Sequence, residues 1–324
     1  MLFPFSYITV DINGRCNLRC KFCAEGQGLN EQPVRQMPFS SFQQWIGPVL
    51  PELGRLEFFN WSEPFLHTEL FEILNWAAEQ NRNLELLLST NGTIMDEEMA
   101  ERLVSSPVKV LTMTMAGLTK EDYSKYHGVD ALEKFIKSLR LIARAKRSLR
   151  SPNPRIRLRY LRFYFNFVSS AEVRRWVKKH VGADSSFING VTVREGYICG
   201  ANLSGEEIQK AYGVDPKGPS VLSIPVYPSC QKNFPSPAVR ADGAVFPCCN
   251  LPYRDEYIMG YLGEATLQEI WNGPSYRKFR ETSMKGENTV CRNCFFRVPK
   301  SVLKLDRYVI QRMNSRWRMK SMAL

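Results

Sequence analysis

The stretch SYITVDINGRCNLRCKFC (residues 6–23) decides how the rest of the sequence is interpreted. Its first half, residues 6–12, is predicted to form a strand. Its second half places three cysteines, Cys16, Cys20 and Cys23, just past the end of that strand. Because α/β sheets carry their active sites at the carboxyl ends of their strands, we expect the three thiols to lie at the functional edge of a sheet.

The spacing of these cysteines favours an iron–sulfur cluster over a zinc ion. Three thiolates on one loop can bind three irons of a [4Fe–4S] cluster and leave the fourth iron open to a small ligand. A structural zinc site is closed by four ligands, and no fourth cysteine lies nearby. The histidines His67, His127 and His180 are scattered, which argues against zinc fingers of the mixed cysteine–histidine kind.

Strands and helices are predicted to alternate from the N-terminus to about residue 200. Further strands are expected at residues 56–61, 84–90, 108–115, 156–165 and 187–193. Helices are expected at residues 39–50, 69–80, 96–104, 132–145 and 171–181. This alternation predicts parallel βαβ units with right-handed crossovers, that is, an α/β fold.

Three motifs at the ends of predicted strands resemble those of the radical S-adenosylmethionine (radical SAM) superfamily. The first is the C-x3-C-x2-C spacing, with the aromatic residue Phe22 directly before Cys23. The second is Asn-Trp-Ser-Glu-Pro at residues 60–64, which is similar to the family's Gly-Gly-Glu-Pro segment but has Ser62 where glycine is usual. The third is Ser-Thr-Asn-Gly at residues 89–92. The three motifs occur in the order that the family predicts.

This resemblance implies a partial (βα)6 barrel and a radical enzyme. Cys16, Cys20 and Cys23 would hold a [4Fe–4S] cluster whose open iron chelates SAM, and electron transfer would cleave SAM to methionine and a 5′-deoxyadenosyl radical. The residues implied in SAM binding are Phe22, Ser62, Glu63, Pro64, Ser89 and Asn91. The implied partners are a small-molecule or peptide substrate and a reducing protein such as flavodoxin or ferredoxin.

A second group of cysteines, Cys230, Cys248, Cys291 and Cys294, lies in the last third of the chain. A hairpin is predicted beside Cys248, with Asp-Gly at residues 242–243 as its turn, and short helices are expected near residues 267–271 and 276–284. The pattern resembles the SPASM domain and its shortened form, twitch, which occurs in the aminocyclitol dehydrogenase of butirosin biosynthesis. It implies one auxiliary [4Fe–4S] cluster held by the four cysteines; a four-cysteine zinc ribbon is the alternative.

Two cysteines remain outside these ligand sets, Cys249 and Cys199. Some radical SAM epimerases use a free cysteine as hydrogen-atom donor, and Cys249 is the first candidate for that role here. The other interpretation is a small buried apolar residue. We expect hydrogen abstraction from a sugar, aminocyclitol or peptide carbon, leading to dehydrogenation, with epimerisation as the alternative outcome.

Three arginines, Arg155, Arg157 and Arg159, alternate along the fifth predicted strand and therefore share one face of it. Inside a barrel, one of them could bind the SAM carboxylate or an anionic substrate group. A solvated edge face explains the same pattern equally well.

The chain is expected to comprise a radical SAM core (residues 1–213), an auxiliary-cluster domain (214–299) and a basic helical tail (300–324). No apolar run approaches the roughly 20 residues of a membrane span, and the N-terminus lacks the basic region of a signal peptide, so we expect a cytoplasmic protein. The net charge of +12 leaves a non-enzymatic, metal-stabilised nucleic-acid-binding protein as the competing class. It is disfavoured because no basic stripe is interleaved with aromatic residues.

Overall fold

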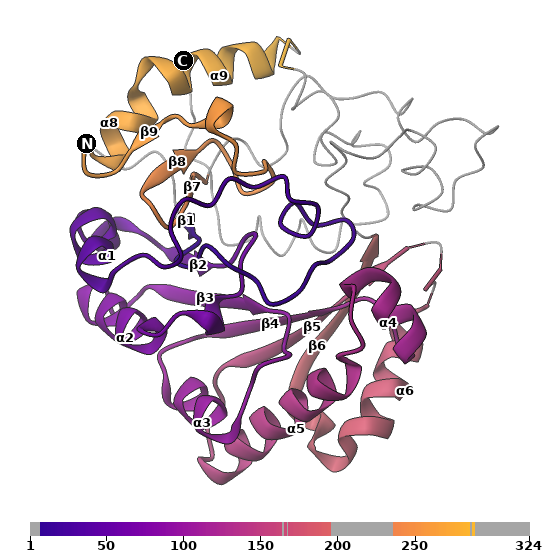
Figure 1. Cartoon of the computed structure of the whole chain (residues 1–324). Helices are drawn as coiled ribbons and strands as arrows, with labels where there is room; N and C mark the ends of the chain where they lie inside the picture. Colours follow the sequence, from indigo (N-terminus) through magenta and orange to yellow (C-terminus); the bar gives the residue numbers. More distant parts are fainter. Residues whose placement is uncertain (1–6, 164, 167, 196–235, 286, 289–324) are drawn as a thin grey trace, which may run out of the picture.

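A mixed sheet of nine strands organises the part of the chain that the structure describes. The computed structural model describes residues 7–163, 165–166, 168–195, 236–285 and 287–288 (Figure 1). The strand order is β6-β5-β4-β3-β2-β1-β7-β8-β9, and every pair from β1 to β6 is parallel. The strands are β1 (Tyr7–Val10), β2 (Arg55–Phe58), β3 (Glu85–Thr90), β4 (Val110–Met115), β5 (Arg155–Arg162), β6 (Ile188–Glu195), β7 (Ala238–Val239), β8 (Ala244–Phe246) and β9 (Gly260–Tyr261).

Helices connect the parallel strands and lie along one side of the sheet in Figure 1. They are α1 (Phe39–Ile46), α2 (Leu70–Gln80), α3 (Glu97–Ser105), α4 (Lys120–His127), α5 (Leu132–Ser148) and α6 (Ser170–Val181). Two further helices, α8 (Leu267–Asn272) and α9 (Pro274–Met284), follow β9 and lie near the short strands β8 and β9 at the top of Figure 1. Short 3-10 turns occur at Gly47–Glu52, Pro64–Leu66, Gly182–Phe187 and Asp255–Tyr257. Strand residues such as Leu56, Leu88 and Met113 are buried with helix residues in one apolar core. No helix among the described residues has the length and apolar character needed to cross a membrane.

The predicted order of strands and helices is confirmed, with boundaries shifted by a few residues. The expected N-terminus of α3 is confirmed because the Asp96 carboxylate accepts a hydrogen bond from the Met99 amide at 2.8 Å. One helix, α4, was not predicted. It begins at Thr119, whose hydroxyl accepts from the Asp122 amide at 3.2 Å, and it ends at Gly128, which has a positive φ of 77°.

The alternation of arginines along β5 is also confirmed. Ile156 and Leu158 are buried, whereas Arg155 and Arg157 are exposed. These two arginines lie at the amino end of β5, away from the strand ends that carry the motifs. Arg155 and Arg157 therefore belong to a solvated face of the strand, while Arg159 is half-buried.

The predicted hairpin is present, and it extends the core sheet. β7 and β8 pair antiparallel with Ala238 opposite Phe246, around a turn in which Gly243 has a φ of 87°. β7 also pairs in parallel with β1, and the Asp11 amide donates to the Val239 carbonyl at 2.8 Å. The hairpin therefore lies directly beside the strand that leads into the first three cysteines. The predicted boundary at residues 213–214 and the tail at 300–324 lie outside the described residues.

Candidate active site

Hydrogen bonds join the carboxyl ends of β1 and β2. The Asp11 carboxylate, just past β1, accepts from the Trp61 amide at 3.0 Å and from the Ser62 hydroxyl. The Asn13 side chain donates to the Glu63 carbonyl at 2.8 Å. Ser62, which stands where the family motif has a glycine, turns its hydroxyl toward Asp11. Burial raises the pKa of Asp11 to about 7.

The Glu63 carboxylate joins the ends of β2 and β3. Its side chain is buried, and it accepts from the Thr90 hydroxyl at 2.7 Å, the Asn91 amide at 2.8 Å and the Phe65 amide at 3.3 Å. Burial raises the pKa of Glu63 to about 7, and these hydrogen bonds oppose that rise. An ionised carboxylate has about four acceptor positions, so three donors leave room for a further one. Pro64 is buried at the start of the following turn.

The three cysteines lie on one loop, residues 11–36, which we call the cysteine loop. Cys16, Cys20 and Cys23 are half-buried, and none of the cysteines in the described part of the chain forms a disulfide. Burial raises the pKa of Cys16 to about 12, that of Cys23 to about 11, and that of Cys20 well above its usual value. The Glu63 carboxylate adds to the rise at Cys16, and the thiols of Cys16 and Cys23 add to the rise at Cys20. Thiols in such a site stay protonated unless a metal centre stabilises their thiolates.

This donor set fits a [4Fe–4S] cluster with one open iron. Among the described residues, no three His, Cys, Asp or Glu side chains converge on a position for a single metal ion. A cubane [4Fe–4S] cluster does not need its ligands to converge on one position, because each thiolate binds a separate iron. Within the loop, Gly26 packs directly against the Cys20 backbone. A Cβ on Gly26 would lie 2.0 Å from the Cys20 carbonyl oxygen, so only glycine fits there.

The end of β3 reaches the cysteine loop through Asn91. Its side-chain amide donates to the Asn17 side chain at 2.8 Å and lies 3.7 Å from the Cys16 sulfur. Asn17 in turn donates to the Thr93 hydroxyl at 2.8 Å. Asn91 is therefore next to Cys16, and Ser89 is half-buried two residues earlier in β3.

Phe22 anchors the cysteine loop from the other side. Its ring is buried, with its centroid 4.9 Å from that of Phe163 and 6.2 Å from that of Tyr126. Cys20 packs against the same apolar cluster. Phe22 thus fixes the loop between two of its cysteines.

A residue that sequence reasoning did not select, His127, contacts a predicted ligand. Its Nδ1 atom lies 3.3 Å from the Cys20 sulfur, and its Nε2 atom lies 3.2 Å from the Ala116 amide nitrogen. Burial lowers the pKa of His127 to about 3. The sequence signals for the helix that carries it are Thr119 and Gly128, which are good residues to begin and end a helix, and the acidic residues of its first turn.

Residues 247–259, between β8 and β9, pack over the motif that follows β2, and we call them the covering segment. The Trp61 indole donates to the Leu251 carbonyl at 2.8 Å, and the Asn60 side chain lies 2.9 Å from the Tyr253 hydroxyl. Cys249 is 7% exposed and belongs to the same apolar cluster as Trp61 and Tyr253, against which Cys23 also packs. The covering segment therefore brings Cys249 into the neighbourhood of the cysteine loop.

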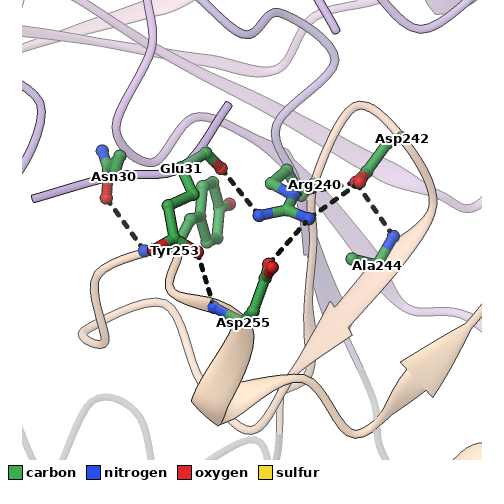
Figure 2. Close-up of polar contacts among 7 residues, drawn as sticks. All are labelled: Asn30, Glu31, Arg240, Asp242, Ala244, Tyr253 and Asp255. Carbon is green, nitrogen blue, oxygen red and sulfur yellow. Dashed lines mark hydrogen bonds and ion pairs between the residues drawn. The ribbon is translucent and has the colours of Figure 1, made fainter. Parts of the chain in front are cut away.

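Polar contacts fasten the covering segment and its hairpin to the cysteine loop (Figure 2). Arg240 is 1% exposed; it donates to the Glu31 carbonyl at 2.6 Å and to both carboxylate oxygens of Asp242 at 2.9 and 2.8 Å. The Glu31 amide donates to the Tyr253 carbonyl at 2.6 Å, and the Asp255 amide donates to the Glu31 carboxylate at 2.9 Å. One buried arginine thus links the two cysteine-bearing regions.

Of the predicted auxiliary ligands, only Cys248 lies among the described residues, where it is half-buried. Cys230, Cys291 and Cys294 lie outside them, as does Cys199. The arrangement of the four auxiliary ligands therefore remains a prediction.

Two family profiles match this chain. The radical SAM superfamily matches residues 10–150, and the SPASM iron–sulfur cluster-binding domain matches residues 230–295. These domains imply [4Fe–4S] clusters as cofactors.

Curated relatives are distant. A protein of Pyrococcus furiosus, described as a tungsten-containing aldehyde ferredoxin oxidoreductase cofactor-modifying protein, is 22% identical over 317 residues, covering 90% of this chain and 87% of the relative. A GTP 3′,8-cyclase of Aliarcobacter butzleri is 24% identical over 139 residues, and the match covers only 41% of each protein.

Solved structures share the fold. BtrN in complex with AdoMet and 2-DOIA has a TM-score of 0.53 and 17% identity, covering 91% of this chain and 94% of that one. Native anSMEcpe with bound AdoMet has a TM-score of 0.55 and 18% identity, covering 95% and 98%.

Proposed function

This chain is a radical SAM enzyme with a C-terminal SPASM domain, and on that premise we propose that it removes hydrogen from a sugar, aminocyclitol or peptide carbon and dehydrogenates it. The observation that carries the proposal is the cysteine loop. It presents three thiols at the end of β1, and side chains from the ends of β2 and β3 lie next to them. The competing class of a non-enzymatic nucleic-acid-binding protein is not retained, because the radical SAM domain identifies an enzyme.

Cys16, Cys20 and Cys23 hold the first cluster in this proposal. With SAM, a cluster of this kind supplies reductive cleavage to a 5′-deoxyadenosyl radical. The chain holds the cluster-binding loop in place, since Phe22 and Asn91 contact the loop from two sides. The half-buried position of the thiols limits access of water to the site.

Glu63 and its neighbours position SAM. The free acceptor capacity of the Glu63 carboxylate suits an ammonium group, and a charge-assisted hydrogen bond of that kind is among the stronger ones. Ser62, whose hydroxyl donates to the Asp11 carboxylate, precedes Glu63 directly and belongs to the same proposed set. Pro64, Ser89 and Asn91 complete the proposed set.

The auxiliary cluster is assigned to Cys230, Cys248, Cys291 and Cys294. Such a cluster supplies an acceptor for the second electron that dehydrogenation removes from the substrate. A reductant such as flavodoxin or ferredoxin supplies the electron for SAM cleavage. Support for this part comes from the SPASM match, which spans all four cysteines.

Epimerisation is the second candidate function, and the position of Cys249 favours it. The thiol lies in the apolar cluster that includes Trp61 and that Cys23 packs against, so it is close to the proposed radical site. A thiol there could return a hydrogen atom to a substrate radical. Dehydrogenation remains the first proposal because the four-cysteine pattern resembles a dehydrogenase.

The test is anaerobic incubation of the reconstituted protein with SAM, a reductant and fractionated metabolite or peptide extracts. The proposal predicts 5′-deoxyadenosine together with a product about two mass units lighter than its substrate. Epimerisation would instead leave the oxidation state unchanged and introduce one deuterium in D2O. Absence of 5′-deoxyadenosine with every fraction, from protein that contains its iron, would contradict both.

A further inference from the structure

His127 connects the end of β4 to the cysteine loop. It is the last residue of α4, and its side chain is 2% exposed. One ring nitrogen, Nδ1, lies 3.3 Å from the Cys20 sulfur, and the other, Nε2, lies 3.2 Å from the Ala116 amide nitrogen. The imidazole therefore bridges a backbone N–H group and a predicted cluster ligand.

The Ala116 contact fixes which nitrogen of His127 carries the proton. A backbone amide can only donate, so Nε2 must accept and cannot carry hydrogen. The remaining hydrogen of the neutral ring is then on Nδ1, which faces Cys20. The Cys20 sulfur is consequently the acceptor of an Nδ1–H···Sγ hydrogen bond.

Aromatic packing holds the ring in this orientation. The Tyr123 ring stacks on His127 with centroids 4.0 Å apart and an interplanar angle of 28°. The Tyr126 ring meets it edge-on at 4.8 Å and 85°. Rotation of the imidazole would break these contacts together with both hydrogen bonds, so the donor stays aimed at Cys20.

We propose that His127 is a positioning residue that tunes the first cluster: it donates Nδ1–H to the Cys20 thiolate and makes the cluster easier to reduce. Hydrogen bonds to cluster sulfurs and to other metal ligands are an established means of setting reduction potential. The donor stabilises the reduced state because that state carries one more negative charge. This inference rests on the proposed function, since it requires Cys20 to be a ligand.

The experiment is a redox titration of the anaerobically reconstituted full-length protein, followed by electron paramagnetic resonance. The signal of the first cluster is identified as the one that changes when SAM is added. His127→Leu should make its midpoint potential more negative by about 59 mV. For a one-electron couple this shift means an about tenfold lower ratio of reduced to oxidised cluster at a given potential. The auxiliary-cluster signal should not move.

Two further variants separate a lost hydrogen bond from a disturbed fold. His127→Asn keeps an N–H donor near the Nδ1 position and should restore most of the potential. His180→Leu removes a histidine on α6 whose Nδ1 atom contacts the Trp176 carbonyl at 2.9 Å, and it should leave the potential unchanged. Iron content is measured for each variant, so that loss of the cluster is recognised.

A measurement on the wild-type protein tests the inference even if the His127→Leu variant fails to fold. Histidine labelled with nitrogen-15 should show magnetic coupling to the reduced, SAM-responsive cluster. An uncoupled histidine nitrogen, or a His127→Leu protein with full iron and an unchanged potential, would overturn the inference. A protein without any SAM-responsive cluster signal would instead overturn the proposed function.

Discussion

The two cysteine-bearing regions are held in place by different forces. The cysteine loop is tied to the strand ends by side-chain hydrogen bonds: the Asp11 carboxylate accepts from the Trp61 amide after β2, and the Asn91 side chain after β3 donates to Asn17. The covering segment is held by apolar packing around Phe246 and Tyr253 and by the buried Arg240. The first site thus depends on the core sheet, whereas the placement of the second region depends on a short hairpin at the edge of that sheet.

The two regions should therefore respond differently to substitution. Replacing the cysteines of the cysteine loop should remove metal and activity and leave the sheet folded, because none of the three belongs to the main apolar core. Changes in the hairpin should loosen the attachment of the C-terminal region before they affect the first cluster.

Replacing the three cysteines of the cysteine loop should have the strongest effect on activity. Cys16→Ala, Cys20→Ala or Cys23→Ala should abolish SAM cleavage, and the triple variant should lose about half of the iron, or about four of eight atoms. Cys291→Ala with Cys294→Ala should lose the other half and weaken the C-terminal domain, because metal binding is coupled to folding. Iron analysis and circular dichroism measure both results. Loss of all the iron from either set of variants, or SAM cleavage that persists in the triple variant of the cysteine loop, would contradict the proposed division.

Arg240→Ala should destabilise the fold by about 3 kcal/mol, because it leaves the partly buried Asp242 carboxylate without its partner. The matched control is Arg144→Ala, whose arginine pairs with Glu97 at 2.7 Å with both side chains more than half exposed. That change should cost under about 1 kcal/mol. Urea unfolding compares the two. A similar loss for both variants would show that Arg240 is not the attachment point of the hairpin.

Glu63→Gln should weaken SAM binding about ten- to a hundred-fold, because a charge-assisted hydrogen bond is worth roughly 1.5–3 kcal/mol. Both clusters should be retained. Asp11→Asn is the control: it removes an acceptor for the Ser62 hydroxyl but no proposed SAM contact, so its effect should be smaller. Equilibrium binding of SAM to the reconstituted proteins provides the measurement. If SAM affinity is the same in Glu63→Gln and the wild type, Glu63 only joins the strand ends.

Cys249→Ala should have the smallest effect if the enzyme is a dehydrogenase. Turnover and the loss of about two mass units should persist, since a buried thiol replaced by a methyl group leaves little space behind. If the enzyme is an epimerase, the variant should still form 5′-deoxyadenosine but fail to give the inverted product. Mass spectrometry of products formed in D2O decides, with Cys199→Ala as the comparison.

The sequence was sufficient to predict the repeated strands and helices and the hairpin, because their signals are local. Asp242-Gly243 identifies a tight turn wherever it stands between apolar runs. The pairing of β7 with β1 was not predictable, since it joins Val10 to Val239 and a two-residue strand carries no signature of its partner.

The parts of the site that were missed depend on contacts between distant residues. Asp11 was not selected because its partners, Trp61 and Ser62, lie about fifty residues away. His127 was missed because α4 has few apolar residues at helical spacing. The motif residues, in contrast, were recognised by their spacing along the chain, because members of one family share that spacing.

Iron content of the reconstituted wild-type protein, measured together with its spectral response to SAM, decides whether the chain holds two clusters of which one binds SAM. The three-plus-four arrangement of cysteines predicts about eight irons per chain and one cluster whose spectrum changes when SAM binds. Stoichiometric zinc without iron after anaerobic reconstitution, or eight irons with no spectral response to SAM, would contradict it.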